Sequence, residues 1–325
     1  MEYCQIPNVE KPVSRLVQGT IMLSSEEEEY SFNLLDEVYD LGINTFDCAH
    51  LYGNGDCERV LGRWLSDRNL RKEVVLLTKC CHMNSDRNRV TPFDISSDLN
   101  DSLARLQTDF IDIYLLHRDN PRVPVAPIVD TLNNYINAGI LGVIGGSNWT
   151  HDRIEAANIY ALNSGQQPFG VSSPNFSLAE QVVPPWDGCC SISGNGGVLA
   201  RLWYEENQMP LFTWSSIANG FFSGRITQDN YLTLADQGLI DESTVKSYCT
   251  TENFERLKRV SILAMEKELS IPQVALAYVL QQPLNIFALV GARSSEEVKS
   301  NLEALQMEMS KEEMAWLNLE LNKQP

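Results

Sequence analysis

The chain has 325 residues, of which 43% are hydrophobic, and its 43 acidic against 25 basic side chains give a formal net charge of −18. A chain of this length and composition can bury a large core, and it is neither fibrous nor disordered. The strong acidity argues against nonspecific binding to nucleic acid or to an anionic membrane surface. It leaves room for a local basic pocket that holds one phosphate group.

The N-terminal segment lacks the basic stretch and apolar run of a signal peptide, and no run approaches the roughly 18 apolar residues of a membrane helix. The eight cysteines show no Cys-x-x-Cys spacing and include two adjacent pairs, Cys80-Cys81 and Cys189-Cys190. Because metal sites and disulfide frameworks usually have regular spacing, we expect reduced thiols, no metal site and a cytoplasmic protein. A redox role, with oxidation at Cys48 or Cys80 inhibiting the protein, is the alternative.

Short apolar segments and amphipathic segments alternate along most of the chain. Strands are expected at 13–19, 43–46, 74–78, 110–116, 140–144, 169–171, 210–214 and 286–290. Helices, marked by apolar residues at helical spacing, are expected at about 26–41, 60–65, 95–106, 128–138 and 151–163. Repeated strand–helix units of this kind predict an α/β protein with a closed (β/α)8 TIM barrel, formed by residues 1–325 as one domain.

Two connections are unusually long for such a barrel. Residues 174–197 follow the sixth expected strand, and residues 219–251 follow the seventh. Loops longer than about 15 residues in a compact domain are often functional lids. A plain surface insertion is the alternative for each loop.

Four ionisable residues lie at or just past the ends of three consecutive expected strands. Asp47 directly follows the strand at 43–46, and Tyr52 comes five residues later. Lys79 directly follows the strand at 74–78, and His117 follows the strand at 110–116. In a (β/α)8 barrel the C-terminal strand ends converge on the face that carries catalysis. Each residue alone is more often structural, but the four together predict an active site.

These residue types supply the roles needed to reduce a carbonyl by hydride transfer. A free tyrosine has a pKa of about 10, and the ammonium group of Lys79 is expected to lower the pKa of Tyr52 toward neutrality. Asp47 would keep Lys79 charged and in place. His117 would hydrogen-bond the carbonyl oxygen and orient the substrate, which leaves Tyr52 as the proton donor.

Three motifs carry these residues: Phe46-Asp47-Cys48-Ala49-His50-Leu51-Tyr52-Gly53, Leu77-Thr78-Lys79 and Tyr114-Leu115-Leu116-His117. At these motifs, and over essentially its whole length, the chain resembles the aldo-keto reductase superfamily. The resemblance implies a (β/α)8 barrel that transfers hydride from NADPH, less often NADH, to aldehydes and ketones. It carries the family's catalytic tetrad onto Asp47, Tyr52, Lys79 and His117. The absence of a Gly-x-Gly-x-x-Gly loop is consistent with a barrel rather than an open nucleotide-binding sheet.

The nicotinamide side of the resemblance is uneven. Gly145-Gly146-Ser147-Asn148 resembles the family's Gly-x-Ser-Asn, whose serine and asparagine bind the carboxamide. A helix cap at Ser147 is the alternative. Ser173 stands where the family usually has glutamine, so we expect one carboxamide contact to be lost and nicotinamide binding to be looser or bridged by water. Trp214 stands where a tyrosine commonly stacks on nicotinamide, with ordinary barrel packing as the alternative.

The phosphate and adenosine side matches two further segments. Residues 215–224 resemble the segment that wraps the pyrophosphate, and 290–297 resemble the segment that binds adenosine. Ser294 is expected to cap a helix, with Glu297 at the reciprocal capping-box position, and Arg293 to bind a 2′-phosphate. Glu297 and Ser300 depart from the family pattern, and the Glu297 carboxylate opposes a 2′-phosphate. The cofactor contacts that the resemblance implies are Gly19, Thr20, Ser147, Asn148, Ser173, Trp214, Ser215, Ser216, Gly220, Gly224, Gly291, Arg293, Ser294, Glu297 and Asn301.

We therefore expect an NADP(H)-dependent oxidoreductase, or one that uses NADH, acting on a small-molecule aldehyde, ketone or sugar. The pocket walls are expected from the two long loops and from Leu23, Leu51, His82 and Trp149. This mix favours an aromatic or amphipathic carbonyl over a polar sugar. The alternatives are a nicotinamide-binding sensor or partner subunit with little turnover, and a lyase or isomerase that uses Lys79 as a Schiff base. The sequence does not predict the substrate's identity or the oligomeric state.

Overall fold

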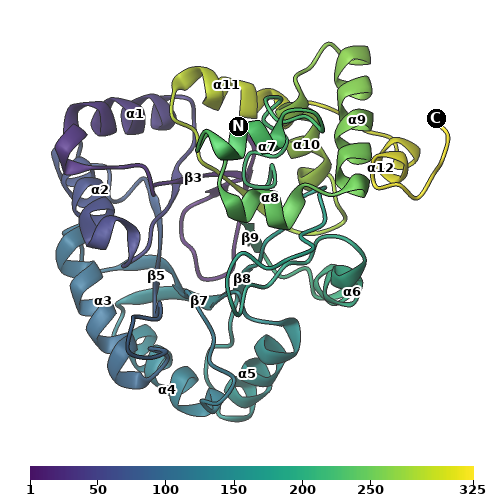
Figure 1. The fold of residues 1–325 in the computed structure, drawn as a ribbon. Coiled ribbons are helices and arrows are strands. Elements are labelled where there is room, and N and C mark those ends of the chain that lie inside the picture. Colours follow the sequence, from purple (N-terminus) through teal and green to yellow (C-terminus); the bar gives the residue numbers. More distant parts are fainter.

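The computed structural model describes residues 1–325, and its centre is a closed barrel of parallel strands (Figure 1). The strands are hydrogen-bonded in the order β10-β3-β4-β5-β6-β7-β8-β9, so each pairs with the next along the chain and the last closes on the first. Their bounds are β3 (Leu16–Gly19), β4 (Thr45–Asp47), β5 (Val75–Cys80), β6 (Ile111–Leu116), β7 (Leu141–Ser147), β8 (Val171–Ser173), β9 (Leu211–Thr213) and β10 (Ile286–Val290). The predicted (β/α)8 barrel is confirmed.

Helices pack around the outside of the barrel, where their apolar faces join the strands in the main core (Figure 1). The helices that follow successive strands are α1 (Glu28–Asp40), α2 (Asp56–Asp67), α3 (Pro92–Leu106), α4 (Val125–Asn137), α5 (His151–Asn163), α6 (Val198–Asn207), α10 (Ile271–Leu280) and α11 (Ser295–Ala304). The sequence expectation for the fifth helix, 151–163, matches α5 at both ends. No helix of the structure is both long enough and apolar enough to cross a membrane.

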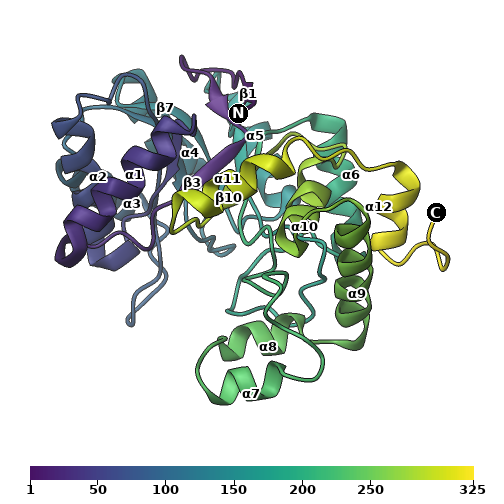
Figure 2. The same ribbon diagram turned by 90° about the horizontal axis from the view of Figure 1, so that it is seen from above.

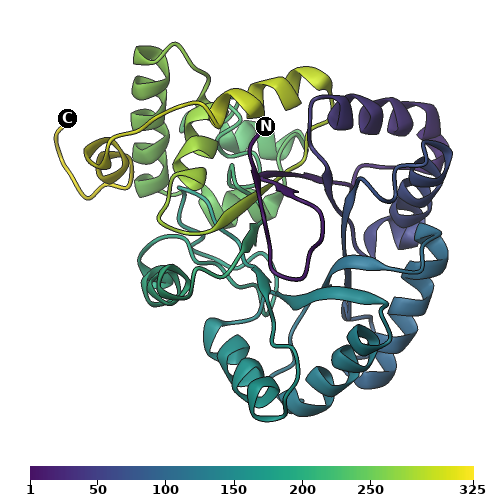
Figure 3. The same cartoon turned by 180° about the vertical axis from the view of Figure 1, so that it is seen from behind.

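A hairpin of two short strands, β1 (Tyr3–Cys4) and β2 (Val13–Ser14), precedes the barrel. Figure 3 shows this N-terminal segment lying across one end of the barrel. Ile6, Val9 and Val13 join the apolar cluster inside the barrel, together with residues of the barrel strands. The hairpin therefore closes the N-terminal end of the strands and leaves the opposite end for a site.

The two long connections differ in structure. Residues 174–197, here called the strap loop, are mostly irregular, with one bridge between Asn175 and Ser191 and a final 3-10 turn at Asn195–Gly197. The second connection contains two short helices, α7 (Tyr231–Asp236) and α8 (Glu242–Tyr248), and leads into α9 (Thr251–Glu266). Figure 2 shows α7 and α8 projecting from one side of the molecule. The last helix, α12 (Lys311–Leu317), packs against α9.

Candidate active site

The inner side-chain layers of the barrel end in polar residues at the C-terminal ends of the strands. On β5, Val75 and Leu77 face the apolar cluster inside the barrel, and Lys79 is the next residue of the same alternating series. On β6 the same alternation places His117 one step beyond Leu115. A strand turns alternate side chains to one face, so both polar groups are aimed over the apolar interior.

Lys79 is the centre of a buried group of polar side chains. Its Nζ forms an ion pair with Asp47 at the end of β4 and donates a hydrogen bond of 3.0 Å to the carbonyl oxygen of Cys48. The same Nζ lies 3.4 Å from the hydroxyl oxygen of Tyr52. Burial opposes a charge on Lys79, but Asp47 and Tyr52 raise its pKa above the ordinary value. Lys79 is thus a fixed ammonium group beside the tyrosine hydroxyl.

The pKa of Tyr52 differs from the sequence expectation. Burial raises the pKa of Tyr52 above its ordinary value, and the opposing effect of Lys79 is the smaller one. Lys79 lowers the pKa of Tyr52 as expected, but the net change is upward, because the sequence could not show how much of the tyrosine is desolvated. Tyr52 holds its proton at neutral pH, as a proton donor must.

His117 is buried beside Tyr52 in the neutral form. Their ring centroids lie 5.8 Å apart at an interplanar angle of 82°, and the ring of His82 lies 5.0 Å from His117 on another side. Burial, with the charges of Lys79 and Arg118, holds the pKa of His117 well below its ordinary value. Its Nδ1 atom is buried without a hydrogen-bond partner. A neutral imidazole with unused hydrogen-bonding capacity can orient a carbonyl oxygen.

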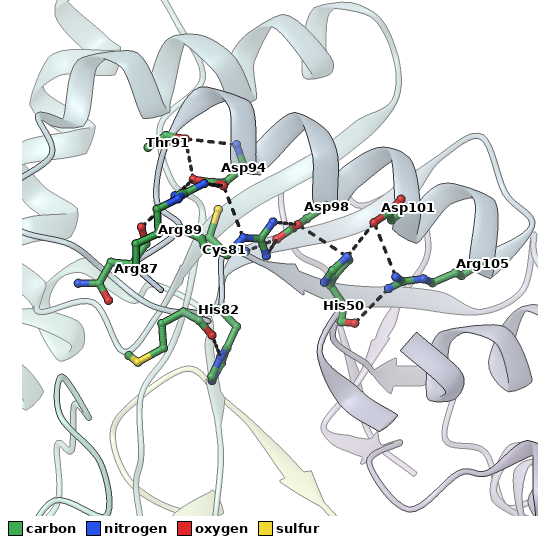
Figure 4. Close-up of polar contacts among 12 residues, drawn as sticks. His50, Cys81, His82, Arg87, Arg89, Thr91, Asp94, Asp98, Asp101 and Arg105 are labelled. Carbon is green, nitrogen blue, oxygen red and sulfur yellow. Dashed lines mark hydrogen bonds and ion pairs between the residues drawn. The ribbon is translucent and has the colours of Figure 1, made fainter. Parts of the chain in front are cut away.

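Helix α3 fixes the two loops on which Tyr52 and Lys79 depend (Figure 4). Past the end of β5, Cys81 has a left-handed φ of 63°, and its N–H donates to the Asp98 carboxylate at 2.9 Å. In the loop after β4, His50 lies 3.1 Å from Asp101, and Arg105 donates to the His50 carbonyl at 3.1 Å. One helix therefore sets the spacing between the loop that carries the tyrosine and the strand that carries the lysine.

The predicted pocket residues divide into two pairs. His82 faces His117 as described, and Leu51 is 39% exposed at the rim. Leu23 and Trp149 instead lie in the main core, where Trp149 packs on Phe169 at 5.3 Å. Their place on the substrate wall stays a prediction, since three of the four tetrad residues are also buried in this structure.

A scan against protein-family models matches residues 15–318 to the aldo/keto reductase family. The chain belongs to that family. Curated relatives named as oxidoreductases and the barrel fold agree with this membership, so the protein is an NAD(P)-dependent oxidoreductase. The buried tetrad described above lies inside the matched region.

Relatives of this reductase include bacterial and fungal proteins. The uncharacterized oxidoreductase YrpG of Bacillus subtilis is 28% identical over 98% of this chain and 95% of its own length. Norsolorinic acid reductase A of Aspergillus parasiticus is 27% identical over 95% of this chain and 78% of that protein. The aldo-keto reductase Tm1743, solved with the inhibitor epalrestat, superposes with a TM-score of 0.72 at 20% identity, covering 98% of this chain and 99% of that chain. The structural likeness supports the fold.

At the expected nicotinamide end of this reductase, the predicted residues converge. Ser147 at the end of β7 donates to the Ser173 carbonyl at 3.0 Å, and the Ser173 hydroxyl is buried without a partner. The side-chain oxygen of Asn148 accepts a 3.2 Å hydrogen bond from the N–H of Cys190 in the strap loop. The free hydroxyl of Ser173, together with the side chains of Ser147 and Asn148, offers donors and acceptors that fit a carboxamide. The hydrogen bond from Cys190 to Asn148 would have to break first.

Trp214, the residue expected to stack on nicotinamide, is covered by another indole. Trp186 of the strap loop stacks on Trp214 with centroids 5.2 Å apart and an interplanar angle of 26°. The cavity that remains between the two long loops at this point is about 100 Å³. Ligand pockets usually have about 300–1,000 Å³, so a nicotinamide stacked on Trp214 would require the strap loop to be displaced. Trp186 was missed from the sequence, since its only local mark is the preceding Pro184-Pro185.

The segment expected to wrap the pyrophosphate forms a turn with consecutive left-handed residues, Ala218, Asn219 and Gly220, at φ of 54°, 52° and 83°. The N–H groups of Asn219 and Gly220 donate to no backbone carbonyl of the chain. Successive free N–H groups in such a turn form an anion-binding concavity, so the turn fits a phosphate group. The hydroxyl of Ser216 is already used, since it lies 3.3 Å from the carbonyls of Thr213 and Leu289.

The adenosine end combines a helix start with a carboxylate. Ser294 caps α11 by accepting the Glu297 N–H at 3.3 Å, which confirms the expected cap. The Glu297 carboxylate accepts the N–H of Arg293 at 2.8 Å. A reciprocal capping box would use the N–H of Ser294 instead, so the expected capping box is not formed. A helix start favours an anion such as a 2′-phosphate, but here the Glu297 carboxylate already lies at that position.

The remaining predicted cofactor residues lie around the same end of the barrel. Gly19 ends β3, and Thr20 donates its hydroxyl to the Asp47 carbonyl at 2.9 Å, which ties the two strand ends together. Gly291 directly follows β10, and Asn301 lies on α11. Gly224, with a φ of 82°, lies in the loop after the phosphate turn.

Proposed function

We propose that the protein reduces an aldehyde or ketone to an alcohol, with Tyr52 as the general acid. The observation that carries this is the Tyr52 hydroxyl held 3.4 Å from the Lys79 ammonium, which is itself paired with Asp47 in a buried site. NADPH is the expected cofactor, and NADH is the alternative that Glu297 favours; either supplies the hydride when bound. A small-molecule carbonyl substrate, a cytoplasmic location and a single domain stay predictions.

The residues divide the work as follows. The carbonyl oxygen accepts a hydrogen bond from neutral His117 and lies within reach of the Tyr52 hydroxyl. As the carbonyl carbon gains a hydride, negative charge develops on the oxygen, and Tyr52 transfers its proton there. The tyrosinate that remains is stabilised by the Lys79 ammonium, and Asp47 keeps that ammonium charged and in place. In the alcohol-oxidising direction the same proton returns to Tyr52.

The test is Tyr52→Phe, which removes the proton and keeps the ring. NADPH oxidation with a panel of simple aldehydes should fall by at least about 100-fold, the scale of general acid catalysis, while cofactor binding persists. Tyr3→Phe, at an exposed tyrosine outside the site, is the matched control and should retain activity. Full activity of Tyr52→Phe on several carbonyls would show that another group donates the proton.

The two alternative functions give different outcomes. A sensor or partner subunit would bind the cofactor without turnover in the wild-type protein and would copurify with another protein. A Schiff-base enzyme needs an uncharged lysine, whereas Asp47 holds the pKa of Lys79 above its ordinary value. Borohydride trapping of a substrate on Lys79 would support that second alternative.

A further inference from the structure

Arg118, which directly follows His117, has a buried side chain with almost no partners. Only 9% of the residue is exposed. The guanidinium makes one hydrogen bond, from Nη1 to the carbonyl oxygen of His117 at 2.9 Å. Its Nε atom is buried without a partner, and Nη2 makes no hydrogen bond. The Nε–Nη2 edge, which is the edge that grips a carboxylate in two parallel hydrogen bonds, is therefore unused.

The other buried arginines each have an acidic group acting on them. Arg259 forms a 3.0 Å ion pair with Glu255. Arg256 also has a buried Nε without a partner, but Glu180 raises its pKa against the effect of burial, and it donates to Asn253 at 3.1 Å. No carboxylate is among the groups that act on Arg118: burial lowers its pKa, and Tyr52 and Cys189 oppose this. A buried cation without an acidic partner is costly, which suggests that a partner arrives from outside the chain.

The surroundings of Arg118 place it on the substrate side of the tetrad. Its guanidinium lies 4.8 Å from the ring centroid of Trp186, and its charge contributes to the lowered pKa values of both His117 and His82. Trp186 is 38% exposed, so the strap loop covers the guanidinium from the solvent side. Displacing Trp186, as cofactor entry already requires, would uncover the free edge of Arg118. The rings of Tyr52 and His82 lie 5.8 Å and 5.0 Å from the His117 ring, and both residues are close enough to Arg118 for their charges to interact with it.

We propose that Arg118 binds an anionic group, best a carboxylate, of the carbonyl substrate, and so selects aromatic aldehydes or ketones that carry a negative charge. The inference rests on the proposed reductase function, since it names the substrate class of the same site. The planar guanidinium edge matches a carboxylate, and the aromatic side chains suit a flat spacer between the carboxylate and the carbonyl. Arg118 is thus a specificity-determining residue, separate from the proton-transferring group.

The experiment compares 4-carboxybenzaldehyde with 4-nitrobenzaldehyde, because a nitro group has the shape of a carboxylate without the charge. For each protein, kcat/KM is measured for both aldehydes with NADPH, and their ratio cancels general losses of activity. Arg118→Met should lower the carboxylate-to-nitro ratio by about 10- to 100-fold, and Arg118→Lys, which keeps the charge, should lower it less. Arg122→Met, at an exposed arginine of the same loop, should leave the ratio unchanged.

The outcomes separate this proposal from the proposed function. If the wild-type protein reduces both aldehydes and Arg118→Met keeps the wild-type ratio, the anion site is refuted while the reductase activity stands. If neither aldehyde is reduced, the proposed function fails. Calorimetric titration with 4-(hydroxymethyl)benzoate and with neutral 1,4-benzenedimethanol then measures whether Arg118 binds the anionic compound. Binding of the benzoate alone, lost in Arg118→Met, would support the site, whereas equal or absent binding of both compounds would refute it. Circular dichroism of each variant confirms that it is folded.

Discussion

Removal of the Trp186 ring is expected to tighten cofactor binding. In the structure this indole stacks on Trp214 at 5.2 Å, where nicotinamide is proposed to lie, and it also contacts the Arg118 guanidinium at 4.8 Å. Both contacts must break before a nicotinamide can replace the indole. The variant Trp186→Ala lacks both contacts, so cofactor binding no longer has to break them.

The size of the effect follows from the two contacts. An aromatic pair contributes about 0.5–1.5 kcal/mol beyond its buried area, and a partly exposed cation–π contact contributes about 0.5–1 kcal/mol. Together the two contacts stabilise the strap loop over Trp214 by about 1–2.5 kcal/mol. Trp186→Ala should therefore lower the dissociation constant of the cofactor about 5- to 70-fold. Trp186→Phe keeps a smaller ring, so its dissociation constant for the cofactor should lie between those of the wild type and Trp186→Ala.

The assay is isothermal titration calorimetry with NADPH and with NADH, because tryptophan fluorescence would change with the substitution itself. Wild type, Trp186→Phe and Trp186→Ala are titrated at one salt concentration and one pH. An unchanged or weaker affinity of Trp186→Ala would refute the reasoning, since it would mean that the indole does not compete with the cofactor. Equal tightening in both variants would assign the effect to the loop backbone rather than to the ring.

Three further outcomes test other parts of the structure. Glu297→Gln removes the carboxylate at the start of α11 and should raise the preference for NADPH over NADH by about 5- to 30-fold, measured as a ratio of dissociation constants. The pKa of His117 is held well below its ordinary value, so the unfolded state takes up this proton first as the pH falls. Stability should therefore decrease below about pH 6.5, by up to about 1.4 kcal/mol per pH unit from this group, and urea unfolding of His117→Gln at pH 5 to 7 should show a smaller slope. Asp98→Asn weakens the buried pair with Arg89 and should lower the free energy of unfolding by about 1–3 kcal/mol, whereas Asp101→Asn, whose side chain is 54% exposed, should cost under about 1 kcal/mol.

The barrel could be predicted because its signals are local. Each strand is a short apolar run and each helix a periodic segment, so residues 151–163 alone were enough to place α5. The elements that the sequence did not reveal lack such patterns. Strand β1 is only two residues long, and the expected strand at 13–19 divides into β2, which pairs with β1, and the barrel strand β3. Helices α7 and α8 lie inside a long connection. Their positions depend on contacts with the barrel rather than on a pattern of their own.

In the candidate site, too, only the features with local sequence signals could be predicted. The position of Lys79 followed from one rule, that polar residues at C-terminal strand ends converge, and the structure places it beside Asp47 and Tyr52. The burial that raises the pKa of Tyr52 arises from tertiary packing, which no local pattern reports. For the same reason the sequence could not show that Trp149 is almost completely buried.

Trp186 shows why the long loops matter more than their sequence indicates. It lies between the residue proposed to bind the substrate anion, Arg118, and the residue proposed to stack on nicotinamide, Trp214. Arg118 lies two residues past the end of β6, whereas Trp186 comes from an irregular loop. Trp186 is held there by its contacts with Arg118 and Trp214 and by the Cys190–Asn148 hydrogen bond. Both proposed ligands would have to displace the same indole, so access to the tetrad depends on the strap loop.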